Sequence, residues 1–223
     1  KSEEILDEKY INFNKKILIK NLNIFINKKK LLRISKIKIQ KNEKILIHGN
    51  IGVGKSTVGE YLSGLRFNKK NKIFIDDKKL SNSNLLAYRN LFSLYTSNNY
   101  LFMGSIKDNI ILDKPFRKKL FNKVCKLCTL DQIFKNKKIN ENFYVNSESK
   151  NLSEGQKQII CLARTLYENK QIIILDEPTS HLNFNLANKI INQLISIKDK
   201  TIFIITHDKN IIKKFSKRIH LIN

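Results

Sequence analysis

Residues 49–57 have the types and spacing that hold phosphate groups. They match G-x-x-x-x-G-K-[ST] between an apolar run at 44–48, which predicts a buried strand, and a stretch at 58–65 with helical apolar spacing. In such a loop, successive backbone N–H groups and the helix N-terminus face one concavity that attracts phosphate oxygens. We therefore expect the loop to bind a nucleoside triphosphate. Its residues are Gly49, Asn50, Ile51, Gly52, Val53, Gly54, Lys55, Ser56 and Thr57.

Four polar side chains are of the types needed for phosphate hydrolysis. Lys55 can place a positive charge at the β- and γ-phosphates, and the Ser56 hydroxyl can bind Mg²⁺. Further along, the apolar run 172–175 ends in Asp176 and Glu177. At the carboxyl end of a central strand, Asp176 can bind Mg²⁺ while Glu177 polarises the attacking water. The pattern predicts ATP and Mg²⁺ as cofactors.

A second anion site is predicted at residues 152–156. Ser153 can cap the helix that begins there, and Gly155 allows a phosphate to come close. One nucleotide cannot bridge both anion sites within a chain, so we expect two copies to face each other head to tail around ATP. This segment consists of Leu152, Ser153, Glu154, Gly155 and Gln156.

The remaining sequence pattern describes the elements that must position these residues. Stretches 17–26 and 31–39 alternate apolar and polar residues, as half-solvated antiparallel strands do. Residues 105–134 have helical spacing and residues 134–150 have the composition of a polar loop, so we expect the middle segment to form a separate helical lobe without strands. The other strands are expected at 72–77, 91–95, 171–175, 201–205 and 218–222, and the other helices at 153–167, 183–197 and 208–215.

Apolar strands bounded by helices imply a parallel sheet covered on both faces. The predicted fold class is α/β: a P-loop NTPase core with a mostly parallel sheet, an antiparallel β subdomain at the N-terminal side and an inserted α-helical subdomain. A length of 223 residues fits one domain with a small inserted lobe. No apolar run is long enough to span a membrane.

The formal net charge of +24 has two interpretations. It could attract nucleic acid or anionic lipid headgroups. Alternatively it reflects a composition rich in Lys, Asn and Ile, because the lysines are scattered rather than gathered in one block. We favour the compositional interpretation and expect no nucleic-acid partner.

The three cysteines are too few for a disulfide framework. Cys125 and Cys128 form a C-x-x-C that could seed a zinc site or a redox pair, but no second pair with ligand spacing follows. We expect buried, reduced thiols, since free cysteine behaves as a small apolar residue.

Residues 17–223 resemble the nucleotide-binding domain of ATP-binding-cassette (ABC) proteins. The resemblance is carried by the loop 49–57, the signature 152–156 and the strand 172–177, in that order. It extends to 178–183, which is similar to the family's D-loop, and to His207 at the position of its switch histidine. It implies an ATPase in which Lys55, Glu177 and His207 are catalytic and in which His207 contacts the γ-phosphate.

Residues 100–110 resemble a stretch typical of ABC exporters. The resemblance implies an exporter's ATP-hydrolysing domain, at the cytoplasmic face of a membrane, whose partners are a second nucleotide-binding domain and a transmembrane domain on the same polypeptide. Residues 1–16 would then be a linker from that membrane domain, 17–223 the ATPase domain, and about 98–165 its helical subdomain.

Several positions depart from the family pattern. Ser97 occupies the position of the family's glutamine loop, and Ile26 aligns with the aromatic residue that stacks on adenine, so we assign that contact to the neighbouring Phe25. Two alternatives stay open: a soluble ABC ATPase that acts on nucleic acid or ribosomes, and a degenerate cassette that only binds ATP. Because Lys55, Asp176 and His207 are all present, we expect slow hydrolysis rather than none.

Overall fold

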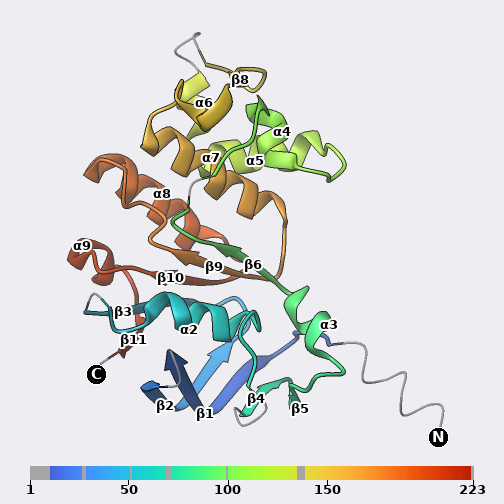
Figure 1. The fold of residues 1–223 in the computed structure, drawn as a ribbon, viewed down its shortest axis with the longest axis vertical. Coiled ribbons are helices and arrows are strands. Elements are labelled where there is room, and N and C mark those ends of the chain that lie inside the picture. Colours follow the sequence, from blue (N-terminus) through green and yellow to red (C-terminus); the bar gives the residue numbers. More distant parts are fainter. Residues whose placement is uncertain are drawn as a thin grey trace, which may run out of the picture. The chain divides into compact units, whose positions relative to one another are not determined.

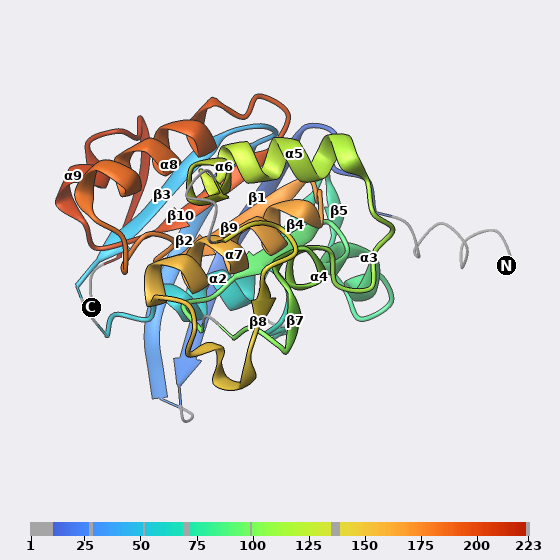
Figure 2. The same cartoon turned by 90° about the horizontal axis from the view of Figure 1, so that it is seen from above.

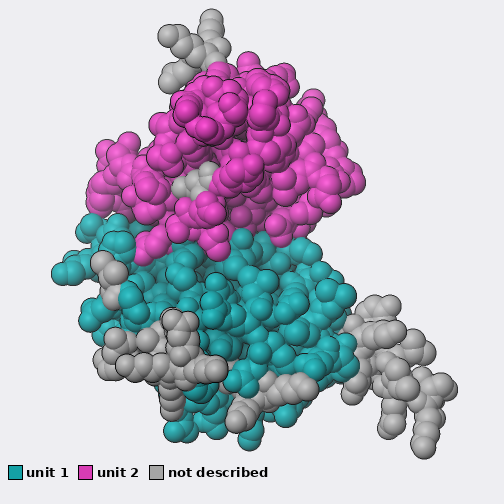
Figure 3. All heavy atoms as spheres, viewed as in Figure 1, with its two compact units in different colours: residues 1–94, 170–176, 198–223 teal, residues 95–169, 177–197 magenta. Residues whose placement is uncertain are grey.

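A computed structural model describes residues 11–26, 29–50, 52–68, 72–98, 100–134 and 139–221. Residues 1–10 of the predicted linker and loop residue Ile51 lie outside these described residues. The chain divides into two compact units, coloured teal and magenta in Figure 3. The first comprises residues 1–94, 170–176 and 198–223, and the second residues 95–169 and 177–197.

The first unit contains a five-stranded sheet with strand order β11-β3-β10-β9-β6. Its pairings β11–β3, β3–β10 and β10–β9 are parallel. β9 and β10 are buried at every position and consist mainly of isoleucine, as expected for parallel strands covered on both faces. The strands are β3 (Lys44–Gly49), β6 (Phe92–Tyr95), β9 (Ile172–Asp176), β10 (Thr201–Ile205) and β11 (Lys217–Leu221).

The helix α2 (Lys55–Leu62) begins within the predicted phosphate loop and contains its last three residues, Lys55, Ser56 and Thr57. It packs closely on the parallel sheet at Gly59, because a Cβ there would lie 3.1 Å from the Ile205 side chain and 3.3 Å from that of Ile174. A side chain at this position would push the helix away from β9 and β10. The short helices α3 (Leu85–Arg89) and α9 (Lys209–Ile212) also belong to this unit.

A second, antiparallel sheet with strand order β2-β1-β4-β5 completes the first unit (Figure 1). The predicted alternation places one face of β1 in the core that it shares with the parallel sheet. The buried positions of β1 are Ile17, Ile19, Leu22 and Ile24. The strands are β1 (Lys16–Ile26), β2 (Lys29–Gln40), β4 (Lys72–Ile75) and β5 (Lys78–Lys79).

Two predicted elements of this unit are shorter in the structure. The strand expected at 72–77 ends at Ile75, because Asp76 and Asp77 have positive φ angles of 44° and 74° and turn the chain into β5. Aspartate tolerates this left-handed region better than most residues. The helix expected at 208–215 covers only Lys209–Ile212.

Asp76 also holds the start of β1 and the segment before it in place through hydrogen bonds. Its carboxylate accepts hydrogen bonds from the backbone N–H groups of Asn14, Lys15 (2.8 Å) and Lys16 (2.7 Å). Partial burial opposes ionisation of this carboxyl, yet the hydrogen bonds from Lys16, Asn14 and Lys15 hold its pKa below the usual range. Ile11 and Phe13, in the same segment, are buried in the core of the first unit.

Asp76→Asn should therefore lower the free energy of unfolding by about 1 kcal/mol at pH 7, since an amide accepts these N–H groups less well than a carboxylate. The folded pKa is depressed, so this contribution is fully present above the unfolded pKa of about 4 and disappears as the pH falls through the folded value. Urea unfolding of both proteins at pH 7 and at acidic pH measures the difference.

The matched control is Asp77→Asn, because Asp77 makes an exposed ion pair with Lys16 at 3.1 Å. Its unfolding free energy should stay close to that of the wild type. An Asp76→Asn difference that does not shrink on acidification would contradict the role assigned to this carboxylate.

The second unit is mainly helical. Figures 1 and 2 show α4 and α5 beside α7. Arg164 of α7 joins α7 to α4 and to the segment before it, because its guanidinium donates to the Asn109 carbonyl at 2.7 Å and to the Tyr100 carbonyl at 2.9 Å. The helices are α4 (Ile106–Ile111), α5 (Lys118–Leu127), α6 (Leu130–Phe134), the 3₁₀ turn η1 (Ser147–Ser149), α7 (Glu154–Tyr167) and α8 (Phe184–Ser196).

The prediction that the middle segment contains no strands is wrong. β7 (Gly104–Ser105) pairs antiparallel with β8 (Tyr144–Val145). The backbone N–H groups of Ile106 and Lys107 continue the contact by donating to the carbonyls of Phe143 and Glu141. The pairing joins segments about forty residues apart, and strands of two residues are too short to show an alternating pattern.

The prediction of buried, reduced cysteines is confirmed: Cys125, Cys128 and Cys161 are free and buried. Burial, together with the nearby Glu141 and Asp131, raises the pKa of the Cys125 thiol to about 12, so it is protonated at neutral pH. The described residues contain no group of three or more histidine, cysteine, aspartate or glutamate side chains that could hold a metal ion. None of the helices in the described part of the chain combines the length and the apolar character needed to cross a membrane.

Candidate functional site

The predicted phosphate loop joins β3 to α2 within the first unit. Gly49 ends β3, where a Cβ would lie only 2.5 Å from the backbone oxygen of Leu221 on the neighbouring β11. Gly54 precedes α2 with a left-handed φ of 90°, which a residue with a side chain rarely adopts. The two glycines therefore allow the loop to fold tightly between the sheet and the helix.

The start of α2 is suited to an anion. Its N-cap, Gly54, has no side chain to accept from the first backbone N–H groups, and the described first turn contains no acidic residue. The Lys55 ammonium folds back over the loop and donates to the carbonyls of Gly49 (3.1 Å) and Asn50 (3.0 Å). The donors and the positive charge that a triphosphate needs are thus gathered at one place, so the loop fits the phosphates of ATP.

Strand register brings two further predicted residues to the same edge of the sheet. Ile205 of β10 lies opposite Ile47 of β3 on one side and opposite Asp176 of β9 on the other. Asp176 is therefore about 10 Å from β3, two strand spacings away, at the carboxyl edge where the phosphate loop begins. It is 7% exposed, which suits a carboxylate that binds a metal ion beside phosphate.

His207 follows β10 at this edge. The preceding Thr206 is buried, its N–H donates to the Ile47 carbonyl at 3.2 Å, and its hydroxyl oxygen accepts from the Asp208 N–H at 3.1 Å. These contacts fix the turn on which His207 stands, and the His207 side chain is exposed. The loop, Asp176 and His207 thus share one edge of the first unit.

Phe25, the predicted adenine contact, is in the antiparallel sheet of the first unit. It follows a register shift in β1 between Ile24 and Phe25, and its side chain is 36% exposed. An exposed ring at this point can stack on a flat base. The side chain of Ile26, the aligned position, lies outside the described residues.

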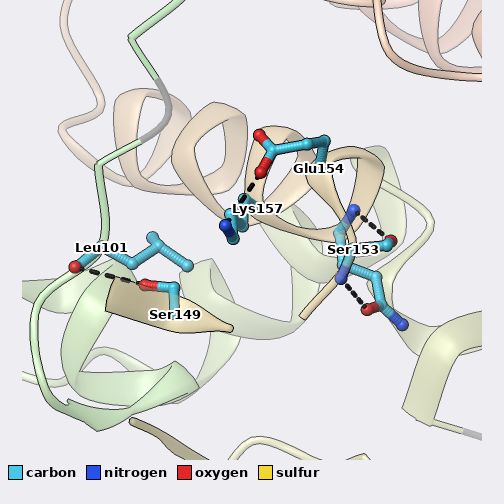
Figure 4. A network of polar contacts seen from close by, with 6 residues as sticks. Leu101, Ser149, Ser153, Glu154 and Lys157 are labelled. Carbon is cyan, nitrogen blue, oxygen red and sulfur yellow. Dashed lines mark hydrogen bonds and ion pairs between the residues drawn. The ribbon is translucent and has the colours of Figure 1, made fainter. Parts of the chain in front are cut away.

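The signature segment stands at the start of α7 in the second unit (Figure 4). The predicted cap is confirmed: the Ser153 hydroxyl accepts from the Gln156 N–H at 3.2 Å. Sequence reasoning did not foresee the return contact, in which the Gln156 side-chain oxygen accepts from the Ser153 N–H at 2.8 Å. The spacing of Ser153 and Gln156 is that of a capping box, so the sequence did contain the signal.

Glu154 and Gly155 form the first turn of α7. The Glu154 carboxylate accepts from the Lys157 ammonium at 2.8 Å, and this hydrogen bond, with the charges of Lys157 and His181, lowers its pKa. A Cβ on Gly155 would lie 3.0 Å from the backbone oxygen of His181. Only glycine allows the D-loop segment to pass this close to α7.

Glu177 follows Asp176 directly and begins the second unit's 177–197 segment. It has a positive φ of 50°, and its carbonyl accepts from the Gln158 side chain at 3.1 Å and from the Ser180 hydroxyl at 3.3 Å. Sequence reasoning missed Gln158. A polar residue among the apolar positions of α7 was the available signal, because buried polar groups need partners.

Fold and site together define a nucleotide-binding α/β domain of the P-loop class. The family model described as ABC transporter matches residues 32–180, and the chain belongs to this family.

The chain is similar to curated relatives with different named transport roles. The lactococcin-G-processing and transport ATP-binding protein LagD of Lactococcus lactis subsp. lactis is 30% identical over 205 residues, covering 90% of this chain and 29% of LagD. The methionine import ATP-binding protein MetN of Clostridioides difficile (strain 630) is 29% identical over 214 residues, covering 91% of this chain and 64% of MetN. The chain therefore spans less than a third of LagD and less than two thirds of MetN.

A solved structure gives the same fold. The structure of a bacterial Atm1-family ABC exporter with ATP bound superposes with a TM-score of 0.85 at 20% identity, covering 96% of this chain and 38% of that chain.

Lys55→Ala should raise the dissociation constant for ATP at least about tenfold, because hydrogen bonds to charged groups contribute about 1.5–3 kcal/mol. Fluorescence titration with a labelled ATP analogue measures this. Lys213→Ala, an exposed lysine of the same unit, is the control and should bind as the wild type does. Equal affinities for Lys55→Ala and the wild type would refute the phosphate-loop assignment.

Proposed function

We propose that this chain is the ATP-hydrolysing domain of an ABC exporter. The observation that carries the proposal is the shared sheet edge, where the phosphate loop, Asp176 and His207 lie on adjacent parallel strands of one unit. An edge that only bound nucleotide would not need a buried carboxylate and an exposed histidine beside the phosphate loop. We further propose residues 1–16 as the linker, whose last residues, 11–16, pack on the first unit. The proposed ATPase domain is 17–223, with about 98–165 as its helical subdomain.

The proposed site residues divide the reaction between them. Lys55 and the backbone N–H groups of the loop hold the β- and γ-phosphates, while Ser56 and Asp176 would bind Mg²⁺, which neutralises charge on the phosphates. Glu177 accepts a proton from the attacking water, and His207 orients that water and contacts the γ-phosphate. Phe25 stacks on the adenine.

The signature at the start of α7 supports a two-chain active site. Residues 152–156 contribute to the ATP of a second copy, so the functional unit is a head-to-tail dimer around two ATP. The location of residues 152–156 at the N-terminus of α7 supports this role, because helix N-termini bind anions.

The proposed direction of transport rests on residues 100–110, which resemble a stretch typical of ABC exporters. The relatives do not decide it, because one named for lactococcin-G processing and transport and one named for methionine import are about equally similar. The proposed transmembrane partner lies on the same polypeptide, and the proposed location is the cytoplasmic face of a membrane.

ATP hydrolysis by the 223-residue chain should rise with about the square of its concentration, because two copies form each active site. A phosphate-release assay over a dilution series measures the exponent. A rate strictly proportional to concentration would contradict the two-chain site, and no hydrolysis at any concentration would contradict the ATPase assignment.

Glu177→Gln should abolish hydrolysis while ATP holds the two copies together, since the amide cannot accept the proton from water but leaves the phosphate contacts intact. Size-exclusion chromatography with and without ATP, beside a phosphate-release assay, measures both effects. Asp199→Asn, an acid that follows α8 outside the proposed site, is the control and should hydrolyse ATP normally. A Glu177→Gln protein that stays monomeric in ATP would contradict the proposal.

A further inference from the structure

Gln158 has a buried polar side chain, and its hydrogen bonds go to one short segment of the chain. It lies on α7 in the second unit and is 0% exposed. Its amide nitrogen donates to the Glu177 carbonyl and to the Ser180 hydroxyl, both at 3.1 Å, and its amide oxygen accepts from the His181 N–H at 3.0 Å. Both ends of the amide are therefore committed to residues 177–181.

The segment that Gln158 holds begins in an unfavourable backbone conformation. Glu177 has a φ of 50°, a region that costs free energy for a residue with a side chain and persists only where neighbouring contacts enforce it. The Ser180 N–H at 3.4 Å and the Ser180 hydroxyl at 3.3 Å also donate to the Glu177 carbonyl. The Gln158 amide reaches this carbonyl from a different element, α7.

We propose that Gln158 is a positioning residue for hydrolysis: its amide fixes the backbone of Glu177 so that the Glu177 carboxylate points correctly at the attacking water. This inference rests on the proposed function, in which Glu177 acts on that water. Gln158 does not touch the nucleotide and acts only through Glu177.

The hydrogen bond from Gln158 to the Glu177 carbonyl connects α7, the helix of the signature segment, to the proposed catalytic residue. α7 begins with the capped signature segment, and Gln158 lies on its second turn, two residues after Gln156. A capped helix moves as a rigid element, so a shift of its N-terminus when a second copy's ATP binds there is carried to the Glu177 backbone through Gln158. Glutamine suits this position because its amide both donates to Glu177 and accepts from His181.

The test uses Gln158→Met in the 223-residue chain, because methionine keeps the volume and burial but neither donates nor accepts in this way. At protein concentrations where specific activity has levelled off, kcat should fall at least about tenfold, the factor expected for one lost hydrogen bond of about 1.4 kcal/mol. The KM for MgATP should stay within about twofold, because the phosphate loop is untouched.

Thr165→Val is the matched control. Thr165 is also a buried polar residue of α7, but its hydroxyl donates only to the Cys161 carbonyl of the same helix, at 3.1 Å. Its kcat should remain near that of the wild type. In the Glu177→Gln background, Gln158→Met should leave ATP-dependent dimerisation unchanged, whereas a merely structural defect would weaken dimerisation in both backgrounds.

Three results would overturn the proposal: an unchanged kcat for Gln158→Met, a rise in KM that accounts for the whole loss, or loss of dimerisation in the Glu177→Gln background. If Gln158→Met does not fold, as judged by thermal unfolding, the substitution Ser180→Ala tests the proposal in its place, because Ser180 is exposed and its loss should not prevent folding. It removes one donor to the Glu177 carbonyl, so kcat should fall about threefold, and an unchanged kcat would refute the positioning role. Failure of the proposed function is distinct, because the wild type would then not hydrolyse ATP or Glu177→Gln would hydrolyse it normally.

Discussion

The parallel pairing of β3, β10 and β9 is the constraint on which the first unit's site depends. Parallel strands end at the same edge, so residues from distant parts of the sequence meet there. Ile205 fixes the register, with Ile47 on one side and Asp176 on the other. A shift of β10 by one residue would move each of its side chains to the opposite face of the sheet and displace His207 from this edge.

Tight packing beside the sheet then fixes the phosphate loop. Gly49 passes the β11 backbone where a Cβ would clash, and Gly59 lets α2 rest directly on β9 and β10. Both glycines remove side chains at contacts that the interior could not accommodate, because protein interiors are close-packed. The direction of the α2 N-terminus, and with it the anion site, follows from these two close approaches.

The second unit combines a stable cap with a strained turn. Ser153 and Gln156 satisfy each other's backbone N–H groups at the start of α7. By contrast, Glu177 holds a conformation that the chain would avoid without help, and the buried amide of Gln158 supplies part of that help. Strain of this kind is retained at functional positions when neighbouring contacts enforce it, which agrees with the catalytic role proposed for Glu177.

The sequence by itself determined the phosphate loop, the carboxylates at the end of β9, the Ser153 cap and most strands and helices, because each follows from local spacing and turn chemistry. Only the tertiary structure decided the β7–β8 pairing, the anchoring of residues 14–16 on Asp76 and the contacts of Gln158 with residues 177–181. These interactions join segments that are far apart in the chain. Residue type and spacing along one segment carry no information on which distant backbone group a buried amide or carboxylate will meet.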